Sequence, residues 1–379
     1  MSQMLLQKIL AKGFPTQRDE QWKYTNINHI ALKAFILAGR DKALPCLYDE
    51  HIISENHIIF INGYIEKISL PAEVTYTTIL KNSPETENPN LSADIFENLN
   101  QHFFQDGLSI YITQSLNKSL QILYISTESN WIQPRNQIIL AEHCEAVIIE
   151  SFFGTTSSVT NIVTEIETKS NSKLSYFKIQ QENPAAFHIG KTNILAHKNS
   201  VVKTFTFSTG GLLARSDINI KLAGEGAAAD LYGLYISKNR THLDHHTVIE
   251  HDATQTKSRE LYHGILMDQS RAVFNGKVIV HPHAAQTEAE QQNHNLLLSS
   301  EAEIDTKPEL EIYCDDVKCT HGATIGQLDE KALFYLRTRG LDEDSAKKLL
   351  INAFANKILS YITNENLREM LKEKVGHLC

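Results

Sequence analysis

Turn-forming residues recur through the middle of this chain at a nearly constant interval. Clusters of polar and small residues fall near Cys144, Asn171, Asn199, Glu225 and Ala253, about 26 to 28 residues apart. A β-sandwich would show turn signals about every 8 to 12 residues, without self-similarity at a longer period. A sustained longer period is typical of a solenoid, in which each coil of the chain stacks on the one before it. The repeat therefore favours a parallel β-solenoid over a sandwich.

A closer internal match supports stacked coils near the end of the repeat. Residues 256–267 can be laid on residues 287–298, and each segment places a His seven residues after a Thr, followed by an apolar triplet. His263 and His294 are 31 residues apart, and His321 follows 27 residues later. Because residues one period apart stack on neighbouring coils, we expect the three histidines to form a line along one face. His321 would then lie near the last coil.

The rest of the chain divides around this repeat, which predicts a mainly β fold. Residues 101–325 are predicted to form the β-helix core, since short apolar runs alternate there with polar turns. Residues 1–100 indicate an α/β, mostly helical region, with a β-hairpin at residues 56–68 around an Asn-Gly pair and a linker with a short helix at residues 82–100. Residues 326–379 show a helical pattern. We therefore expect a parallel β-helix flanked by N-terminal and C-terminal helical regions.

The C-terminal region carries a broad apolar stripe at helical spacing. Asp342 and Asp344 are candidate N-caps, because acidic side chains favour the start of a helix. A stripe of this width is not expected on a solvated helix. We expect these helices to cap the open end of the solenoid and to dock a partner protein. The stripe consists of Leu349, Leu350, Ala353, Phe354, Ile358, Leu359 and Ile362, and its predicted docking residues are Leu349, Leu350, Phe354 and Ile358.

Net charge and cysteine count narrow the classes of function. The chain has 36 Lys and Arg against 45 Asp and Glu, for a net charge of −9. This balance argues against nucleic acid as a partner, because phosphate binding needs a basic face. No apolar run approaches about 18 residues, so a membrane span is not expected. Five cysteines are too few, and odd in number, for a secreted disulfide framework, so we expect free thiols and a cytoplasmic location.

The densest group of metal-binding side chains lies between Cys314 and His321. This segment holds two thiols, one imidazole and two carboxylates, and Cys and His are common ligands of zinc, copper and iron–sulfur species. In an extended strand, Cys319 and His321 share a face, whereas Cys314 would need a bend to join them. Two ligands do not close a metal site, so the pair is either a buried thiol beside a hydrogen-bonded imidazole or a half-site that another subunit completes. The possible accessory ligands are Cys314, His294 and His263.

Other motifs give weaker signals. His242, Asp244 and His246 share a face of an extended strand and could bind a metal, but histidines that line an exposed solenoid face are the more ordinary interpretation. The Gly-Lys-Thr sequence at residues 190–192 lacks the earlier glycine of a P-loop, so ATP chemistry would have to come from a partner. β-Solenoids often host polysaccharide lyases, and the paired aspartates after Cys314 keep a β-helical carbohydrate-active enzyme open as the alternative function.

Four stretches of the sequence carry a family resemblance. They are residues 13–25 (GFPTQRDEQWKYT), residues 258–276 (SRELYHGILMDQSRAVFNG), residues 295–324, and residues 334–340 (FYLRTRG) with the helix after them. In these stretches the chain resembles the SufB/SufD family of iron–sulfur cluster assembly scaffold proteins. SufB carries a cysteine in the coil before the last, where residues 292–297 read QNHNLL in this chain. The resemblance therefore favours the SufD branch.

The resemblance implies a right-handed parallel β-helix and a non-enzymatic role. A protein of this branch pairs with a SufB-like subunit, binds a SufC-like ATPase through its C-terminal helical region, and takes part in iron acquisition and nascent cluster assembly at the SufB–SufD interface. Carried over to this sequence, the functional Cys and His of that interface fall on Cys319 and His321. The isolated chain would bind no cofactor stably, and iron or an iron–sulfur cluster would be held transiently at the partner interface. Flavin binding, and pairing into a homodimer without the partner, stay open.

Overall fold

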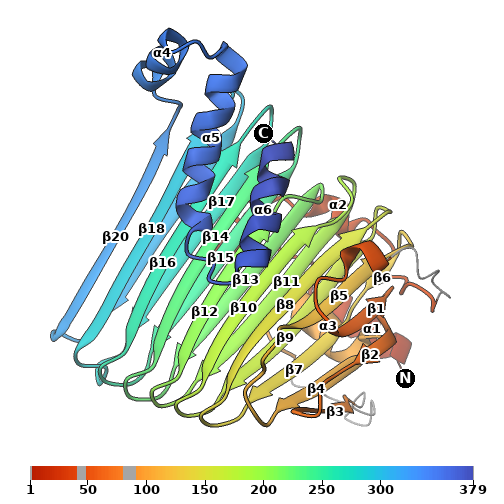
Figure 1. Ribbon diagram of the computed structural model, residues 1–379. Helices are drawn as coiled ribbons and strands as arrows, with labels where there is room; N and C mark the ends of the chain where they lie inside the picture. Colours follow the sequence, from red (N-terminus) through yellow and green to blue (C-terminus); the bar gives the residue numbers. More distant parts are fainter. Residues whose placement is uncertain (1, 41–47, 80–90, 379) are drawn as a thin grey trace.

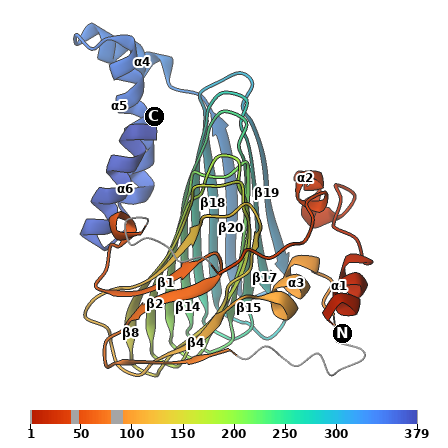
Figure 2. The same cartoon turned by 90° about the vertical axis from the view of Figure 1, so that its right-hand side faces the viewer.

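The chain folds into a parallel β-solenoid of about eight turns, with helices against both of its faces (Figures 1 and 2). The computed structural model describes residues 2–40, 48–79 and 91–378. Most of the linker predicted at residues 82–100 lies outside the described residues, and its last part belongs to a helix. Successive strands alternate between two sheets, so that one strand from each sheet makes one coil.

The two sheets each contain ten strands. Sheet I has the spatial order β2-β1-β5-β8-β10-β12-β14-β16-β18-β20. Its strands are β1 (Asn56–Ile61), β2 (Tyr64–Ser69), β5 (Leu120–Ser126), β8 (Glu145–Gly154), β10 (Lys173–Gln181), β12 (Val201–Ser208), β14 (Ala228–Ser237), β16 (Lys257–Leu266), β18 (Thr287–Leu297) and β20 (Val317–Gly326). Sheet II has the order β19-β17-β15-β13-β11-β9-β7-β4-β3, and β6 pairs with β9. Its strands are β3 (Val74–Thr78), β4 (Gly107–Ile112), β6 (Trp131–Ile132), β7 (Arg135–Leu140), β9 (Val159–Thr168), β11 (Phe187–Ala196), β13 (Leu213–Leu222), β15 (His242–His251), β17 (Arg271–Val280) and β19 (Glu303–Ile312).

The pairing between successive coils is parallel, which confirms the predicted solenoid. Within the described residues, antiparallel pairing is confined to β1 with β2 and β3 with β4, both at the N-terminal end. A sandwich of antiparallel sheets is therefore excluded. The β1–β2 pair is the hairpin predicted at residues 56–68, and its turn residues Asn62 and Gly63 have φ angles of 51° and 84°, as a type I′ turn requires.

The repeat seen in the sequence marks one corner of the solenoid, where the chain passes from sheet II to sheet I. All five predicted turn clusters fall in this corner, on successive coils. Asparagine tolerates a positive φ better than most residues, and the Asn199 amide donates a 3.3 Å hydrogen bond to the Asn171 side chain on the coil before it. The stacked residues with positive φ in this corner are His143, Asn171, Asn199, Gly226, Gln255 and Gln286.

Side chains alternate between the interior of the solenoid, which we call the lumen, and its outer faces. Aliphatic residues fill much of the lumen in rows that cross the coils. Burying each of these side chains contributes about 2 kcal/mol to stability, so the lumen is a packed core and not an open pore. One such row in sheet II consists of Ile166, Ile194, Ile220, Ile249 and Val278.

The N-terminal elements pack mainly on the outer face of sheet II. Ile9, Ile30 and Leu99 come from three different helices and are buried in one cluster with Trp131. These segments therefore add a second, smaller core beside the lumen. The elements are α1 (Ser2–Leu10), a 3₁₀ turn (Glu20–Trp22), α2 (Asn28–Ala31) and α3 (Ile95–Phe103), and a further 3₁₀ turn spans Asp49–His51.

The C-terminal helices cover the outer face of sheet I. They are α4 (Glu330–Thr338), α5 (Glu343–Leu359) and α6 (Glu365–Leu378). Asp342 is the N-cap of α5, as predicted, and accepts a 2.8 Å hydrogen bond from the backbone N–H of Ser345. Ile351 and Ile358 are buried against apolar side chains of sheet I. In the described part of the chain, no helix is both long and apolar enough to cross a membrane.

The expectation that these helices cap the open end of the solenoid is wrong. The outer face of sheet I carries stacked large apolar side chains, among them Phe177, Phe205 and Tyr232. An exposed apolar face of this size needs a cover, and α5 and α6 provide it by lying along the sheet (Figure 2). α4 then projects past β20 (Figure 1), and the edges of β19 and β20 stay uncovered within the described chain.

The three-part division of the sequence can be compared with the observed elements. β20 ends at Gly326 and α4 begins at Glu330, close to the boundary placed at residue 325. Residues 1–100 contain the strands β1, β2 and β3 in addition to helices, so this region is less helical than expected. β1 also pairs in parallel with β5, which joins it to the first coil.

Candidate functional site

The last coil presents Cys319 and His321 at an open end of the lumen. On β20, Cys319 lies opposite Ala289 and His321 lies opposite Gln291 of β18. Val317 and Cys319 pack against the lumen core, so His321, two positions further along the strand, faces the lumen as well. Cys319 is half-buried, whereas His321 is exposed because no further strand covers β20. The two possible ligands thus share a face, about 7 Å apart along the strand.

The surroundings of Cys319 favour a thiol that releases its proton only to a metal. Burial raises the pKa of Cys319, and a hydrogen bond involving the backbone of Ala289 acts in the opposite direction. The thiolate is the form that binds metals, so metal binding has to displace this proton. A thiolate and an imidazole are suitable ligands for iron, zinc or copper, but they leave at least two positions of a tetrahedral site open.

The described residues do not complete this site. Among them, no group of three or more His, Cys, Asp or Glu side chains is arranged to hold a metal ion. Cys314 lies in the turn between β19 and β20, where it is half-buried against the lumen core, and it is a free thiol like Cys319. The exposed Asp315 and Asp316 follow Cys314 in the same turn. The pair on β20 is therefore at most a half-site within this chain.

The predicted line of three histidines is wrong at its last member. His263 and His294 do lie opposite each other on β16 and β18, with ring centroids 5.4 Å apart. His294, however, lies opposite Thr324, and its Nδ1 is 2.8 Å from the Thr324 hydroxyl. The last strands are offset by 30 residues instead of 27, which puts His321 three positions earlier. Because three is odd, His321 also faces the lumen while the other two histidines face outward.

His263 is part of the contact between sheet I and α5. Its side chain is buried, its Nδ1 lies 3.2 Å from the backbone oxygen of Phe354, and its ring centroid is 4.6 Å from that of Phe354. Burial lowers the pKa of His263 to about 4, so the imidazole is neutral near physiological pH. The structure does not bring His263 or His294 together with Cys319 and His321, since the two pairs lie on opposite faces of sheet I.

The predicted docking residues of α5 divide between the sheet and the solvent. Ile358 is fully buried against sheet I, and Phe354 packs against the same cluster, so these two side chains attach α5 to the solenoid. Leu350 is half-buried, and Leu349 is 50% exposed. Of the four, Leu349 is therefore the residue most open to a partner.

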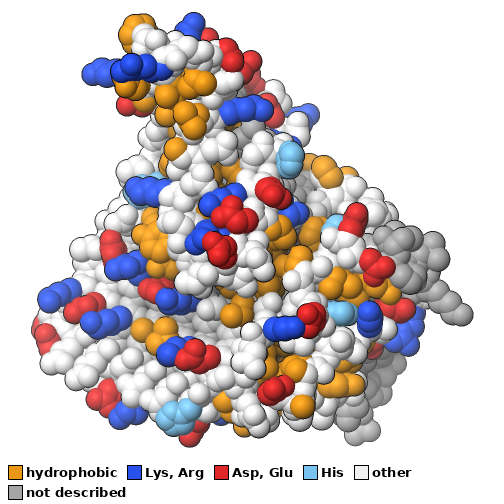
Figure 3. Space-filling model, in the orientation of Figure 1, with side chains coloured by type: hydrophobic (Ala, Val, Ile, Leu, Met, Phe, Trp, Pro, Cys, Tyr) orange, Lys and Arg blue, Asp and Glu red, His pale blue; other side chains and the backbone are white. Residues whose placement is uncertain are grey.

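A larger apolar surface lies where α4 meets the start of α5. We call this surface the helical tip, and Figure 3 shows its apolar side chains together with basic ones at the projecting end of the molecule. The sequence stripe missed most of it, because α4 is short and weakly amphipathic. Its signal was the pair of aromatic residues in FYLRTRG. The exposed apolar residues of the helical tip are Phe334, Tyr335, Leu341 and Leu349.

The N-terminal W-K-Y-T motif binds the outer face of sheet II. The Arg215 guanidinium lies 3.9 Å from the centroid of the Trp22 ring. The Thr25 hydroxyl donates a 2.6 Å hydrogen bond to Asp244, and Asp244 also lies 2.9 Å from His246 Nε2. Although burial alone would raise the pKa of Asp244, the charges of His246 and Arg215 hold it well below its usual range. The His-Asp-His cluster is therefore occupied in attaching the N-terminal segment.

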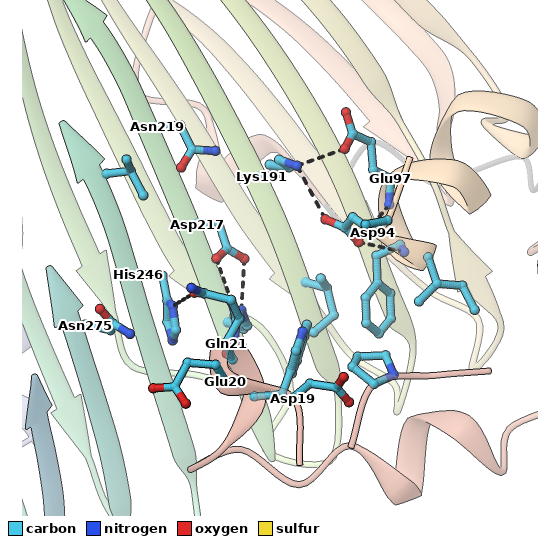
Figure 4. Close-up of a pocket in the computed structure, with 18 of the residues that line it drawn as sticks. Asp19, Glu20, Gln21, Asp94, Glu97, Lys191, Asp217, Asn219, His246 and Asn275 are labelled. Atoms are coloured by element: carbon cyan, nitrogen blue, oxygen red, sulfur yellow. Dashed lines mark hydrogen bonds and ion pairs between the residues drawn. The ribbon is translucent and has the colours of Figure 1, made fainter. Parts of the chain in front are cut away.

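A groove of about 690 Å³ lies between this N-terminal segment, the start of α3 and sheet II (Figure 4). Lys191 Nζ, on its floor, lies 2.9 Å from a carboxylate oxygen of Glu97 and 3.4 Å from one of Asp94. Asp217 is paired with Arg215 at 2.8 Å. These charged groups of the groove are thus neutralised within the chain, and none of them was predicted from the sequence as a site residue.

The sequence pattern also did not reveal a row of polar side chains that leads through the lumen to His321. Glu260, Gln291 and His321 occupy equivalent positions on β16, β18 and β20. Gln291 Nε2 donates a 2.7 Å hydrogen bond to Glu260, and both side chains are buried. Burial raises the pKa of Glu260 to about 7. The signal was present in the two matched segments, where Glu260 aligns with Gln291, but only their histidines suggested a site.

Comparison with known proteins decides the family. Residues 123–354 match the family model for the SufBD core domain of the SUF system of iron–sulfur cluster assembly. The chain belongs to the SufBD family. The iron–sulfur cluster assembly protein SufD of Escherichia coli is 31% identical over 99% of this chain and 92% of its own length. A SufBD family protein of Synechocystis is also 31% identical, over 96% of this chain and 87% of its own length.

The SufBD match covers the part of the fold that carries the half-site. The matched residues run from β5 into α5 and so include the terminal coil. A plant protein, ABCI7 of Arabidopsis thaliana, which is described as chloroplastic, is 27% identical over 98% of this chain and 84% of its own length. The family resemblance of the sequence and the β-helix expected from it are both confirmed. The chain is an iron–sulfur cluster assembly protein of the SufBD family.

Proposed function

We propose that the chain is a scaffold subunit of an iron–sulfur cluster assembly complex, in which Cys319 and His321 form one half of a site that a SufB-like subunit completes. The observation that carries this proposal is the open terminal coil, which presents two ligands on one face of an uncovered strand. Iron or a nascent cluster is the cargo of this site and not a resident cofactor. The role is non-enzymatic, since the chain supplies ligands and surfaces and breaks no bond.

The edges of β19 and β20 support pairing with another β-helical subunit. An edge strand leaves a row of backbone N–H and C=O groups unpaired, and a partner strand can add to it. The terminal coil also exposes Ile312, Tyr313 and Ile325 by 40%, 60% and 52%. A SufB-like subunit that continues both sheets would bury these residues, and it would place its own ligands next to His321.

The helical tip supports docking of a SufC-like ATPase. Exposed aromatic residues that project from the body of a protein are typical of a contact surface. Phe334 and Tyr335 are 69% and 56% exposed, and Arg339 lies over the Tyr335 ring at 5.1 Å. The tip therefore offers an apolar centre with a basic rim.

α5 supplies a physical connection between the helical tip and the half-site. Its first turn belongs to the tip, and its second half lies on β14 and β16 beside His263. β16 neighbours β18, which in turn pairs with β20. Movement of a docked ATPase would thus pull on the coils that position Cys319 and His321, and could open the interface to admit iron or sulfur.

The test is reconstitution of the complex with variants of the terminal coil. The chain is co-expressed with its SufB-like and SufC-like partners, the complex is purified by size exclusion, and cluster formation is followed by visible absorbance. We expect Cys319→Ala and His321→Ala to leave the complex intact and to lower cluster formation at least tenfold (about 1.4 kcal/mol). His294→Ala is the matched control, because this imidazole lies close by on the outer face. Cluster formation at the wild-type rate in a Cys319→Ala, His321→Ala double variant would refute the proposed site.

The ATPase contact is tested separately in the same complex. Phe334→Ala combined with Leu349→Ala should release the ATPase on size exclusion while the SufB-like subunit stays bound. Retention of the ATPase in wild-type amount would place its docking surface elsewhere.

A further inference from the structure

The Gln291 amide has one half of its hydrogen-bonding capacity fixed and the other half open. Its Nε2 donates to Glu260 Oε2 at 2.7 Å. Its Oε1 is buried and has no partner within the described chain. A buried carbonyl oxygen without a partner costs about 1 to 3 kcal/mol, so such an atom calls for an explanation. The side chain directly opposite Gln291 on the next strand is His321.

The facing sheet leaves room for this arrangement of the amide. Gly276 lies on β17, across the lumen from Gln291. A Cβ atom added at Gly276 would lie 2.3 Å from Gln291 Nε2 and 2.9 Å from its Cδ, which no side chain could tolerate without moving the amide. Two independent features, the Glu260 carboxylate and the absence of a side chain at residue 276, thus define where the amide sits.

We propose that Glu260 and Gln291 are positioning residues for His321. The Gln291 Oε1 atom accepts a hydrogen bond from one imidazole N–H of His321, and this leaves the other ring nitrogen directed out of the lumen to bind iron. Neighbouring strands are about 4.8 Å apart, a distance that an amide and an imidazole side chain span together. His321 is exposed and needs only side-chain rotation to reach this acceptor.

The proposal has the chemistry of a metal-ligand support. A metal-binding His generally donates its second ring N–H to an acceptor, which fixes the tautomer and the ring orientation. Glu260 acts one step further away, because it holds the Gln291 amide with its oxygen toward β20. Neither residue touches the cargo. The inference rests on the proposed function of His321.

The experiment reads the His321 tautomer in the full-length chain. Histidine labelled with ¹⁵N is incorporated, and the two ring nitrogens of His321 are assigned by comparison with His321→Ala. In the wild-type chain we expect one tautomer to dominate. In Gln291→Leu the ratio of the two tautomers should fall by about fivefold, the effect of losing one neutral hydrogen bond. Gln292→Leu is the matched control, because Gln292 lies on the same strand and faces outward toward His294.

Glu260 variants separate a positioning role from a merely structural one. Glu260→Gln keeps an acceptor for the Gln291 amide and should retain the wild-type tautomer, whereas Glu260→Leu removes that acceptor and should change the ratio as Gln291→Leu does. If Gln291→Leu failed to fold, Gly276→Ala would give the same test, since its Cβ displaces the amide. An unchanged tautomer ratio in every folded variant of this set would overturn the proposal.

Cluster assembly in the purified complex distinguishes this failure from failure of the proposed function. If His321→Ala stops assembly while Glu260→Leu and Gln291→Leu match the wild type in both tautomer and assembly, the positioning role is wrong and the half-site stands. If His321→Ala assembles clusters normally, the half-site itself is wrong, whatever the tautomer shows.

Discussion

Replacing Glu260 with Gln should stabilise the chain in mildly alkaline solution and change its stability little in acid. Glu260 is 1% exposed in the lumen, and burial raises the pKa of its carboxyl group from 4.5 to about 7. The groups that face it are the Thr247 hydroxyl from sheet II, the Gln291 amide from β18 and the Tyr262 phenol on its own strand. Each of them is neutral near physiological pH, so no cation nearby compensates the ionised carboxylate.

The size of the effect follows from the two pKa values. A pKa raised from 4.5 to about 7 corresponds to about 3 kcal/mol of free energy. Between these pH values the folded chain keeps a proton that the unfolded chain releases, so the free energy of unfolding falls as the pH rises and levels off above about 7. Gln has the same shape and never ionises. The variant should therefore be more stable than the wild type by about 3 kcal/mol at pH 8, and by less than about 1 kcal/mol at pH 5.

The measurement is urea denaturation at half-unit steps from pH 5 to pH 8, followed by circular dichroism. Glu288→Gln is the control, because Glu288 is an exposed residue on the neighbouring strand β18 and its replacement should give a difference that stays nearly constant with pH. A stability difference between wild type and Glu260→Gln that does not vary across this range would show that Glu260 is already ionised in acid. The assignment of a dry, uncompensated carboxyl to this part of the lumen would then be wrong.

Three further changes test the packing around the solenoid. Ile358→Ala should lower the free energy of unfolding by about 3 kcal/mol, because it opens a cavity under α5, whereas the exposed Leu349→Ala should stay within about 0.5 kcal/mol; equal losses would contradict the orientation of α5. Asp244→Ala leaves a buried guanidinium without its partner and should cost about 3 kcal/mol, with faster proteolysis of the N-terminal segment, and an unchanged digestion pattern would argue against the attachment described for it. Gly233→Ala should cost about 2 kcal/mol, since its Cβ would lie 2.1 Å from a lumen tyrosine ring, while Gly322→Ala meets open space and should be neutral; thermal melts compare the two.

The sequence revealed those parts of the fold that depend on local backbone chemistry. The corner between the sheets needs a residue with positive φ on each coil, and Asn171 and Asn199 made it visible as a repeat. The hairpin turn at Asn62 follows the same logic. The second corner has no such regular signal, because its loops vary in length and residue type, and only Asn239 and Asp268 have a positive φ there.

The errors arose where the position of a residue depends on distant parts of the chain. Three extra residues in the last coil move His321 to another rung and to the other face, and periodicity averages over such an insertion. The side of α5 that carries Ile358 could have faced a partner equally well, since the stripe does not say which surface covers it. The contact of Thr25 with Asp244 joins residues more than two hundred positions apart, and neither motif contains a trace of the other.

The edges of β19 and β20 also bear on the life of this protein in the cell. A repeat stack that ends without a lid is an unfinished fold, and only a second polypeptide can finish it. Made in excess, such an orphan subunit would expose sticky β-edges to its own copies and to quality-control proteases. We therefore expect its abundance to be set by its partner, so that matched synthesis of the two chains is a requirement of the architecture as much as of the chemistry.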